Sequence, residues 1–199
     1  MISLSIACAV GCAVLVLAEW RQLAALRVVA KLVASLAFFA AGLVADPDRH
    51  WMIAGLALGV VGDFALLGRS KRAFHAGLAA FLLGHLAYIA GMAALAPPRS
   101  WIAWPAVVPI GAGVLALRWL WPHLGSLRVA VIAYVLAIVV MVIAALAVHE
   151  QTLALGAVLF FASDLAVARD KFVSSSVANR AWGLPAYYTA QLLIAWSLA

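Results

Sequence analysis

The chain has 199 residues, of which 68% are hydrophobic and only 10% are charged, and its mean hydropathy is +1.15. Soluble domains carry about 25% charged residues, so this composition excludes a water-soluble fold and indicates the lipid bilayer as the solvent for most of the chain. The net charge of +6 gives no support for nucleic-acid binding, because no basic patch belongs to a folded soluble surface.

The apolar runs are long, unbroken and rich in Leu, Ala and Val. Only helices and closed barrels satisfy every backbone polar group inside hydrocarbon, and barrel strands would alternate apolar and polar residues. We therefore predict an all-α membrane protein, a bundle of eight transmembrane helices that forms a single domain over residues 1–199. The expected helices are about 2–18, 28–45, 51–68, 74–95, 101–120, 127–148, 152–168 and 181–198.

The first three helices differ in their polar content. The first has no basic residue before it and is predicted as a retained helix rather than a signal peptide. In the second, Lys31 either snorkels to the interface, which we favour, or faces inward and pairs with an acid. In the third, Asp63 lies in the interior, where a carboxylate costs about 3 kcal/mol on insertion scales. Asp63 is therefore predicted to be functional, the alternative being an interhelical hydrogen bond.

The fourth helix carries a stripe of aromatic residues and glycines at spacings of three and four: Phe74, Gly77, Phe81, Gly84 and Tyr88. His85 borders this stripe and is the only histidine deep in a predicted helix. It is either a packing residue or a ligand that acts with a nearby acid. Tyr134, in the sixth helix, is a weaker candidate of the same kind.

The seventh helix holds the second intramembrane acid, Asp164. Asp63 and Asp164 lie equally far from the starts of helices that run in the same direction, about 18 Å below the outer edge. Gly55 and Gly62 precede Asp63 as Gly156 and Ser163 precede Asp164. This similarity suggests two parallel repeats of four helices, and it makes convergence of the two carboxylates in one cavity geometrically easy.

The eighth helix carries Tyr187, Tyr188 and Gln191 in its middle, after Pro185. Gln191 lies one turn from both tyrosines. Tyrosines are common at membrane interfaces, but a position in the middle of a helix favours a place in the cavity.

Basic residues are concentrated in alternate connections. The odd connections hold ten of them (Arg21, Arg27, Arg69, Lys71, Arg72, Arg118, Arg128, Arg169, Lys171 and Arg180), and the even connections hold Arg49 and Arg99. Positive residues favour the cytoplasmic side. We predict cytoplasmic odd loops, outward termini, a bacterial inner membrane and contact with anionic lipid headgroups.

Several catalytic motifs are missing from the sequence, namely a Gly-x-Ser-x-Gly elbow, a Walker loop and a His-Glu-x-x-His zinc site. Any catalysis is therefore expected to use two carboxyl groups and water, without a metal or another cofactor.

Together the motifs resemble the YhhN family of membrane proteins, whose characterised members are lysoplasmalogenases. The resemblance rests on Gly62-Asp63, Phe74-x-x-Gly77-x-x-x-Phe81-x-x-Gly84-His85-x-x-Tyr88, Ser163-Asp164 with Phe172, and Tyr187-Tyr188-x-x-Gln191. It extends from Lys31 to Gln191. One departure is Leu32, where the family often has proline after the lysine.

The resemblance implies hydrolysis of the vinyl ether of a 1-alkenyl lysophospholipid with ethanolamine or choline. The products would be a fatty aldehyde and glycerophosphoethanolamine or glycerophosphocholine. Asp63 and Asp164 would be the general acid and the base, in either order, because glycosidases reach a related cation with two carboxyl groups. The residues expected to orient water or substrate are Lys31, His85, Tyr88, Tyr134, Tyr187, Tyr188 and Gln191. The cavity would open to the membrane, with basic loop residues near the phosphate.

Two other functions compete with hydrolysis. Paired intramembrane acids also serve proton relays, so a proton-coupled transporter of small solutes is the main alternative. Transporters often contain inverted repeats and broken helices, whereas the two Asp helices here run in the same direction. A non-catalytic bundle in which the acids only join helices is the third possibility. The sequence leaves the oligomeric state open.

Overall fold

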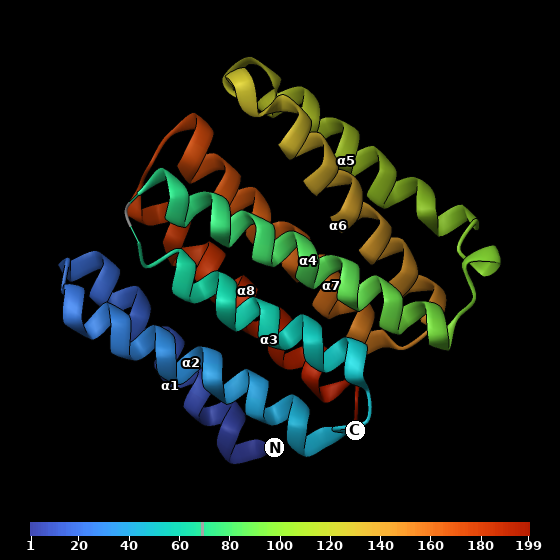
Figure 1. Ribbon diagram of the computed structural model, residues 1–199, viewed down its shortest axis with the longest axis horizontal. Coiled ribbons are helices and arrows are strands. Elements are labelled where there is room, and N and C mark those ends of the chain that lie inside the picture. Colours follow the sequence, from blue (N-terminus) through green and yellow to red (C-terminus); the bar gives the residue numbers. More distant parts are fainter. Residues whose placement is uncertain (69) are drawn as a thin grey trace.

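A computed structural model describes residues 1–68 and 70–199, and this part of the chain forms eight α-helices and no strand (Figure 1). The helices are α1 (Ile2–Arg21), α2 (Ala24–Ala45), α3 (His50–Ala65), α4 (Lys71–Leu95), α5 (Val107–Leu120), α6 (Arg128–Val148), α7 (Gln151–Ala168) and α8 (Val177–Trp196). The predicted all-α class and the order of the eight helices are confirmed.

Six of these helical segments are long and apolar enough to cross a membrane, those containing α1, α2, α4, α5, α6 and α7. Helix α3 has only 16 residues, which span about 24 Å at 1.5 Å per residue, and α8 carries more polar residues together with Pro185 inside the helix. That α3 and α8 also cross the bilayer therefore stays a prediction.

The start of α5 differs most from the prediction. The chain from Trp101 was expected to be helical, but α5 begins only at Val107, after the 3₁₀ turns η1 (Pro98–Ser100) and η2 (Trp104–Ala106). Proline has no backbone N–H and disfavours helix in the residue before it. The prolines of this segment therefore delay the start of the helix to Val107, although the apolar run begins at Trp101.

Side-chain caps extend three helices beyond their apolar runs. The Ser70 hydroxyl accepts a hydrogen bond from the backbone N–H of Ala73, and Ser176 does the same for Asn179 at the start of α8. The carboxylate of Glu150 accepts the N–H groups of Thr152 and Leu153. Such caps satisfy N–H groups that the helix itself leaves free, so α4 and α8 begin several residues earlier than the hydropathy indicated.

The helices lie side by side as a bundle of antiparallel neighbours (Figure 1). Close pairs form between α1 and α2, between α3 and α4, and between α7 and α8, while α8 also packs against α1 and α2. Helix α5 lies at the periphery and packs mainly against α6. The predicted repeat would make the α5–α6 pair correspond to the α1–α2 pair, but α1 and α2 pack more closely than α5 and α6 do. The repeat therefore stays a prediction.

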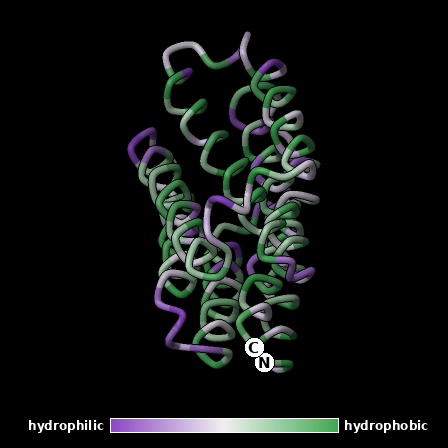
Figure 2. The backbone as a smooth tube through the Cα atoms, turned by 90° about the vertical axis from the view of Figure 1, so that its right-hand side faces the viewer, coloured by the Kyte–Doolittle hydropathy of each residue, from purple (hydrophilic) through white to green (hydrophobic). Residues whose placement is uncertain are grey.

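Both termini lie at one end of the bundle (Figures 1 and 2). The opposite end carries the basic residues of the odd connections, apart from Arg69, which lies outside the described residues. The structure thus separates the charges along the bundle axis as the sequence predicted. Which end faces the cytoplasm stays a prediction from the positive-inside rule.

Hydrophobic residues predominate along the helices (Figure 2), and many large apolar side chains are exposed on the outside of the bundle. Among those most exposed in mid-helix are Leu36, Val61, Val114, Leu136 and Leu155. A soluble protein seldom exposes apolar patches of this extent, whereas lipid tails solvate them at no cost. Together with the six long apolar helices, these surfaces describe a multi-pass helical membrane protein.

Small residues let the Asp-bearing helices approach their partners closely. A Cβ atom added to Gly156 of α7 would lie 3.1 Å from the backbone oxygen of Ala190 and 3.3 Å from the backbone nitrogen of Ile194, both in α8. In α3, a Cβ on Gly55 would lie 2.3 Å from the ring of Tyr88. The absence of side chains at these positions fixes how α7 meets α8 and how α3 meets α4.

We expect Gly156→Val to lower the midpoint of thermal unfolding in detergent, because valine adds two further carbons beyond a Cβ that already meets backbone atoms. Overpacking of this kind costs about 1–3 kcal/mol. Gly111→Val is the matched control, because no atom lies within 4 Å of a Cβ added there in α5. Equal midpoints for the two variants would contradict the close approach of α7 and α8.

Candidate active site

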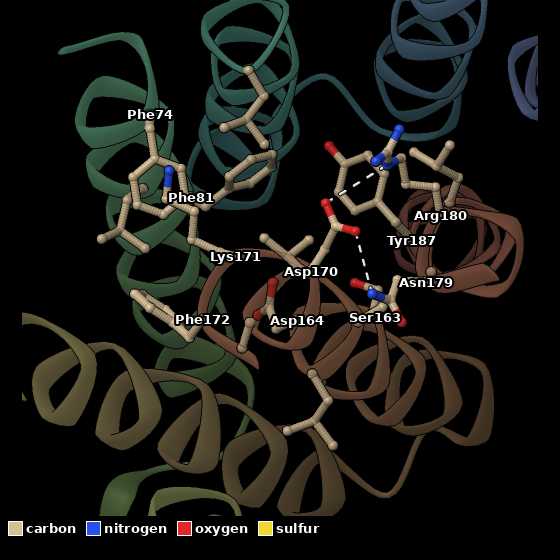
Figure 3. A pocket seen from close by; sticks show the side chains of 18 of the residues that line it. Phe74, Phe81, Ser163, Asp164, Asp170, Lys171, Phe172, Asn179, Arg180 and Tyr187 are labelled. Carbon is tan, nitrogen blue, oxygen red and sulfur yellow. Dashed lines mark hydrogen bonds and ion pairs between the residues drawn. The ribbon is translucent and has the colours of Figure 1, made fainter. Parts of the chain in front are cut away.

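A cavity of about 680 Å³ lies inside the bundle and reaches the end that carries the odd connections. Its deep part is lined by Lys31, Asp63, Tyr134, Asp164 and Tyr187, and its mouth by residues that include Gly68, Ser70, Asp170, Lys171 and Arg180. Figure 3 shows Asp164 between the aromatic side chains on α4 and the polar residues at the start of α8. The two intramembrane acids thus line one cavity, as their equal depth had predicted.

Asp63 is held in a buried ion pair. Its Oδ1 lies 2.8 Å from the ammonium of Lys31, and its Oδ2 accepts a 2.7 Å hydrogen bond from the Ser35 hydroxyl. The hydroxyl of Tyr188 adds a longer contact of 3.4 Å. Asp63 is only 2% exposed. The ammonium on Oδ1 and the hydroxyl on Oδ2 thus give both oxygens of Asp63 a close donor.

The favoured interpretation of Lys31 as a snorkelling residue is therefore wrong. The side chain turns inward from α2 to Asp63 of α3, and Lys31 is 8% exposed. The ammonium does not need to reach the aqueous interface, because its attraction to the buried carboxylate offsets the cost of desolvating both charges. The less favoured alternative, pairing with an acid, is the one that the structure contains.

Asp164 has weaker partners than Asp63. Its Oδ1 accepts a hydrogen bond of 3.1 Å from the Tyr134 hydroxyl. Its Oδ2 lies 3.5 Å from Nε2 of His85, beyond a normal hydrogen bond, and has no hydrogen-bond partner. The side chain is 17% exposed, against 3% for the side chain of Asp63. Within the described part of the chain, Asp164 therefore has one buried oxygen without a hydrogen-bond partner, and no ammonium lies beside it.

His85 is fully buried and lies behind Asp164 rather than in the cavity wall. Its ring packs edge-on against Phe160 and Tyr134, with centroids 4.7 and 5.2 Å away. Neither ring nitrogen has a hydrogen-bond partner. The aromatic packing holds the imidazole next to Oδ2 of Asp164, so a small movement would complete a hydrogen bond between them.

A second polar chain lies behind the cavity wall. The Tyr88 hydroxyl donates to Oε1 of Gln191 at 2.6 Å, and Nε2 of Gln191 donates to the Tyr187 hydroxyl at 3.1 Å. Of these three, only Tyr187 lines the cavity. Tyr88 and Gln191 are thus placed to orient Tyr187, and Tyr188 contacts Asp63 and Ser35. His85, Tyr88, Tyr188 and Gln191 are not among the described residues that line the cavity. Their contacts with substrate stay predictions.

Sequence reasoning missed Ser35 as a site residue. It lies one turn after Lys31 in α2 and binds the other oxygen of the same carboxylate. The spacing of four residues was the available signal, but a lone serine in an apolar helix is usually a packing residue. Charged residues at the cavity mouth include Glu19, Arg27 and Arg180. Glu19 was counted only as a helix end, and the two arginines belonged to the basic loop residues expected near a phosphate without being singled out.

The fold and this site define a class of protein: a helical membrane protein with two carboxyl groups, a lysine and tyrosines around an internal cavity. Comparison with known sequences gives the particular family, since residues 26–198 match the model of the YhhN family. The chain belongs to the YhhN family, and the resemblance inferred from its motifs is confirmed. No solved structure matches the chain.

Two curated relatives carry the name lysoplasmalogenase. They come from Mycobacterium bovis (strain ATCC BAA-935 / AF2122/97) and Mycobacterium tuberculosis (strain CDC 1551 / Oshkosh), and each is 38% identical to this chain over 173 residues. The match covers 78% of this chain and 64% of each relative, so the chain spans less than two thirds of the length of these relatives.

We expect Lys31→Met to destabilise the protein strongly, because it leaves the Asp63 carboxylate buried without a counter-charge. Breaking a buried pair in this way costs about 3–5 kcal/mol. The midpoint of thermal unfolding in detergent should fall, and adding Asp63→Asn should restore a large part of it. Lys71→Met, at an exposed lysine, is the control. Equal midpoints for the two single lysine variants would contradict the buried ion pair.

Proposed function

We propose that this chain is a lysoplasmalogenase-like hydrolase that cleaves the vinyl ether of 1-alkenyl lysophospholipids, giving a fatty aldehyde and glycerophosphoethanolamine or glycerophosphocholine. The observation that carries the proposal is the common cavity of Asp63 and Asp164, in which one acid is ion-paired and the other is not. The relatives named lysoplasmalogenase support the same assignment.

Asp164 is the general acid. A carboxyl group in a poorly solvated cavity without an adjacent ammonium retains its proton more readily. Its carboxyl group delivers that proton to the alkene carbon that is not bonded to the ether oxygen. The π electrons form the new C–H bond, and the carbon next to the ether oxygen becomes an oxocarbenium ion. The Tyr134 hydroxyl stabilises the carboxylate that Asp164 leaves behind.

Asp63 is the base. Its carboxylate forms an ion pair with Lys31, so a negative charge already lies at the cavity when the cation forms. Water adds to the oxocarbenium carbon and gives a proton to Asp63, which produces a hemiacetal. As the hemiacetal collapses, Asp63 returns this proton to the departing glycerol oxygen and Asp164 takes the proton of the hemiacetal hydroxyl. The C–O bond breaks, the aldehyde forms, and both acids regain their starting states.

The cavity suits an amphiphilic substrate. Apolar side chains from α5, α6 and α7 line the wall on one side of the acids: Leu120, Val131, Val135, Ile138 and Phe161. Polar and charged residues line the mouth. An alkenyl chain against the apolar wall and a headgroup at the mouth would place the vinyl ether between them, next to the acids. No observation favours proton-coupled transport.

We expect Asp63→Asn and Asp164→Asn each to abolish aldehyde release from a lysoplasmalogen by the purified full chain in detergent. Asp48→Asn, at an exposed site near the opposite end of the bundle, should keep full activity. Size-exclusion chromatography would show whether the inactive variants remain folded and monodisperse. The proposal would fail if the wild-type protein released aldehyde from no alkenyl lipid.

Metal-free hydrolysis is part of the proposal, because both proton transfers use carboxyl groups of the chain. Release of aldehyde should therefore continue after treatment with EDTA and should not rise when divalent metals are added. Loss of activity on chelation, with recovery on addition of a metal, would replace acid–base chemistry by metal-assisted hydrolysis.

We expect Tyr134→Phe to reduce kcat by about tenfold to hundredfold with little change in KM. A hydrogen bond to a charged group is worth about 1.5–3 kcal/mol, and this one acts on Asp164 mainly after it has lost its proton. Steady-state kinetics on a lysoplasmalogen checks the result. A rise in KM at unchanged kcat would mean that Tyr134 binds substrate rather than stabilising the ionised acid.

A further inference from the structure

Three charged side chains from three helices meet at the mouth of the cavity. The carboxylate of Glu19 in α1 lies 3.0 Å from the guanidinium of Arg180 in α8 and 3.8 Å from that of Arg27 in α2. All three line the same cavity as Asp63 and Asp164. One carboxylate therefore lies between two guanidinium groups, in the lining of the cavity that also holds both acids.

Arg27 retains unused hydrogen-bonding capacity. A guanidinium offers five N–H donors, yet among the described residues the only polar partner of Arg27 is Glu19, in a long contact, and its Nε is buried without a partner there. Arg180 is better satisfied, since it also contacts Ser175 and Asp170. A buried donor without a partner is costly. The Arg27 side chain is 24% exposed, so its guanidinium can also reach an anion at the mouth.

The mouth lies at a suitable distance from the acids for a phospholipid headgroup. Arg27 is one turn before Lys31 on the same face of α2, which places it about 6 Å along the axis toward the mouth. Lys31 in turn contacts Asp63. In a lysoplasmalogen, the three-carbon glycerol unit and one oxygen separate the ether oxygen from the phosphorus. This separation matches the offset between the acid site and the two arginines.

The charges around the mouth favour an anion. Arg27, Arg180 and Lys171 line it together with only two carboxylates, those of Glu19 and Asp170. Asp170 already has partners, because it accepts a hydrogen bond from the side chain of Asn179 and forms an ion pair with Arg180 (Figure 3). It also accepts a hydrogen bond from the backbone N–H of Ser176.

We propose that Arg27 and Arg180, oriented by Glu19, bind the phosphodiester of the lysophospholipid substrate. This inference rests on the proposed function and adds the residues that recognise the headgroup. Two guanidinium groups offer paired N–H donors that match phosphate oxygens. Glu19 is a positioning residue, because its carboxylate contacts both arginines from the side of α1.

The same contacts could instead serve only to fasten α1, α2 and α8 together. The two roles differ in their dependence on the ligand. If the arginines bind phosphate, removing them weakens binding only of ligands that carry a phosphate. If they only hold the helices together, removing them weakens binding of every ligand. The test therefore compares two uncleavable lipids with the same chain, a 1-alkyl lysophosphatidylethanolamine and a 1-alkylglycerol.

We expect Arg27→Gln and Arg180→Gln to weaken binding of the alkyl lysophospholipid to the purified full chain by about tenfold or more. Binding of the alkylglycerol should stay unchanged, and Arg27→Lys should recover part of the loss. Arg128→Gln is the control, because this exposed arginine at the same end stacks on Trp121 outside the cavity. Equal losses for both lipids, or no loss for the phospholipid, would overturn the assignment.

Competition with inorganic phosphate shows whether the site binds the phosphate of a lipid or free phosphate. We expect millimolar phosphate not to displace the alkyl lysophospholipid. Displacement that Arg27→Gln abolishes would mean that the site takes free phosphate, and would overturn the lipid assignment.

Hydrolysis is measured separately on the alkenyl forms of the two lipids. The arginine variants should raise KM for the lysophospholipid at nearly unchanged kcat and leave cleavage of the alkenylglycerol unaltered. If the wild-type protein binds the phospholipid through these arginines but cleaves neither substrate, the headgroup site stands and the proposed hydrolysis fails. If it cleaves both and the variants change neither KM, the headgroup site fails and hydrolysis stands.

Discussion

The ion pair between Lys31 and Asp63 is the interaction on which the rest of the site depends. Either charge alone would be expensive at this depth in a bilayer, and together they offset each other across 2.8 Å. Because Lys31 belongs to α2 and Asp63 to α3, the pair also fixes how these helices meet. Through its contacts with Tyr188, the carboxylate extends this constraint to α8. The same interaction therefore positions three helices and places an ion pair in one wall of the cavity.

Asp164 gains its different chemistry from its surroundings rather than from its position. It lies as far into α7 as Asp63 lies into α3, yet it has a neutral tyrosine and a histidine where Asp63 has an ammonium. Two carboxyl groups at equal depth are thus made unequal, which is what a reaction with separate proton donor and acceptor requires. This asymmetry is also the reason why the roles of the two acids can be assigned in the proposed mechanism, although the sequence left their order open.

Hydropathy and charge predicted much of the fold, because lipid solvation imposes simple rules on long apolar runs. The depth of Asp63 and Asp164 followed from counting along helices. The partner of Lys31 did not, since the choice between snorkelling and pairing depends on which face of α2 meets α3. The start of α5 was misplaced because prolines, rather than a change in hydropathy, determine where this helix begins. Glu19 was missed as a site residue, and Arg27 was not singled out from the other basic loop residues, because residues from separate helices become neighbours only when the bundle packs.

The cavity meets the surroundings at the end of the bundle that carries the basic connections, while the apolar wall formed by α5 and α6 borders the region where lipid tails lie. The two proposed products differ in the same sense: the aldehyde is oily and the glycerophospho-base is freely water-soluble. Each product would therefore leave into its own phase, which makes recombination at the acids rare. It also means that the polar product is discharged into a single compartment, so the orientation of the bundle in the membrane decides which side of the cell recovers it.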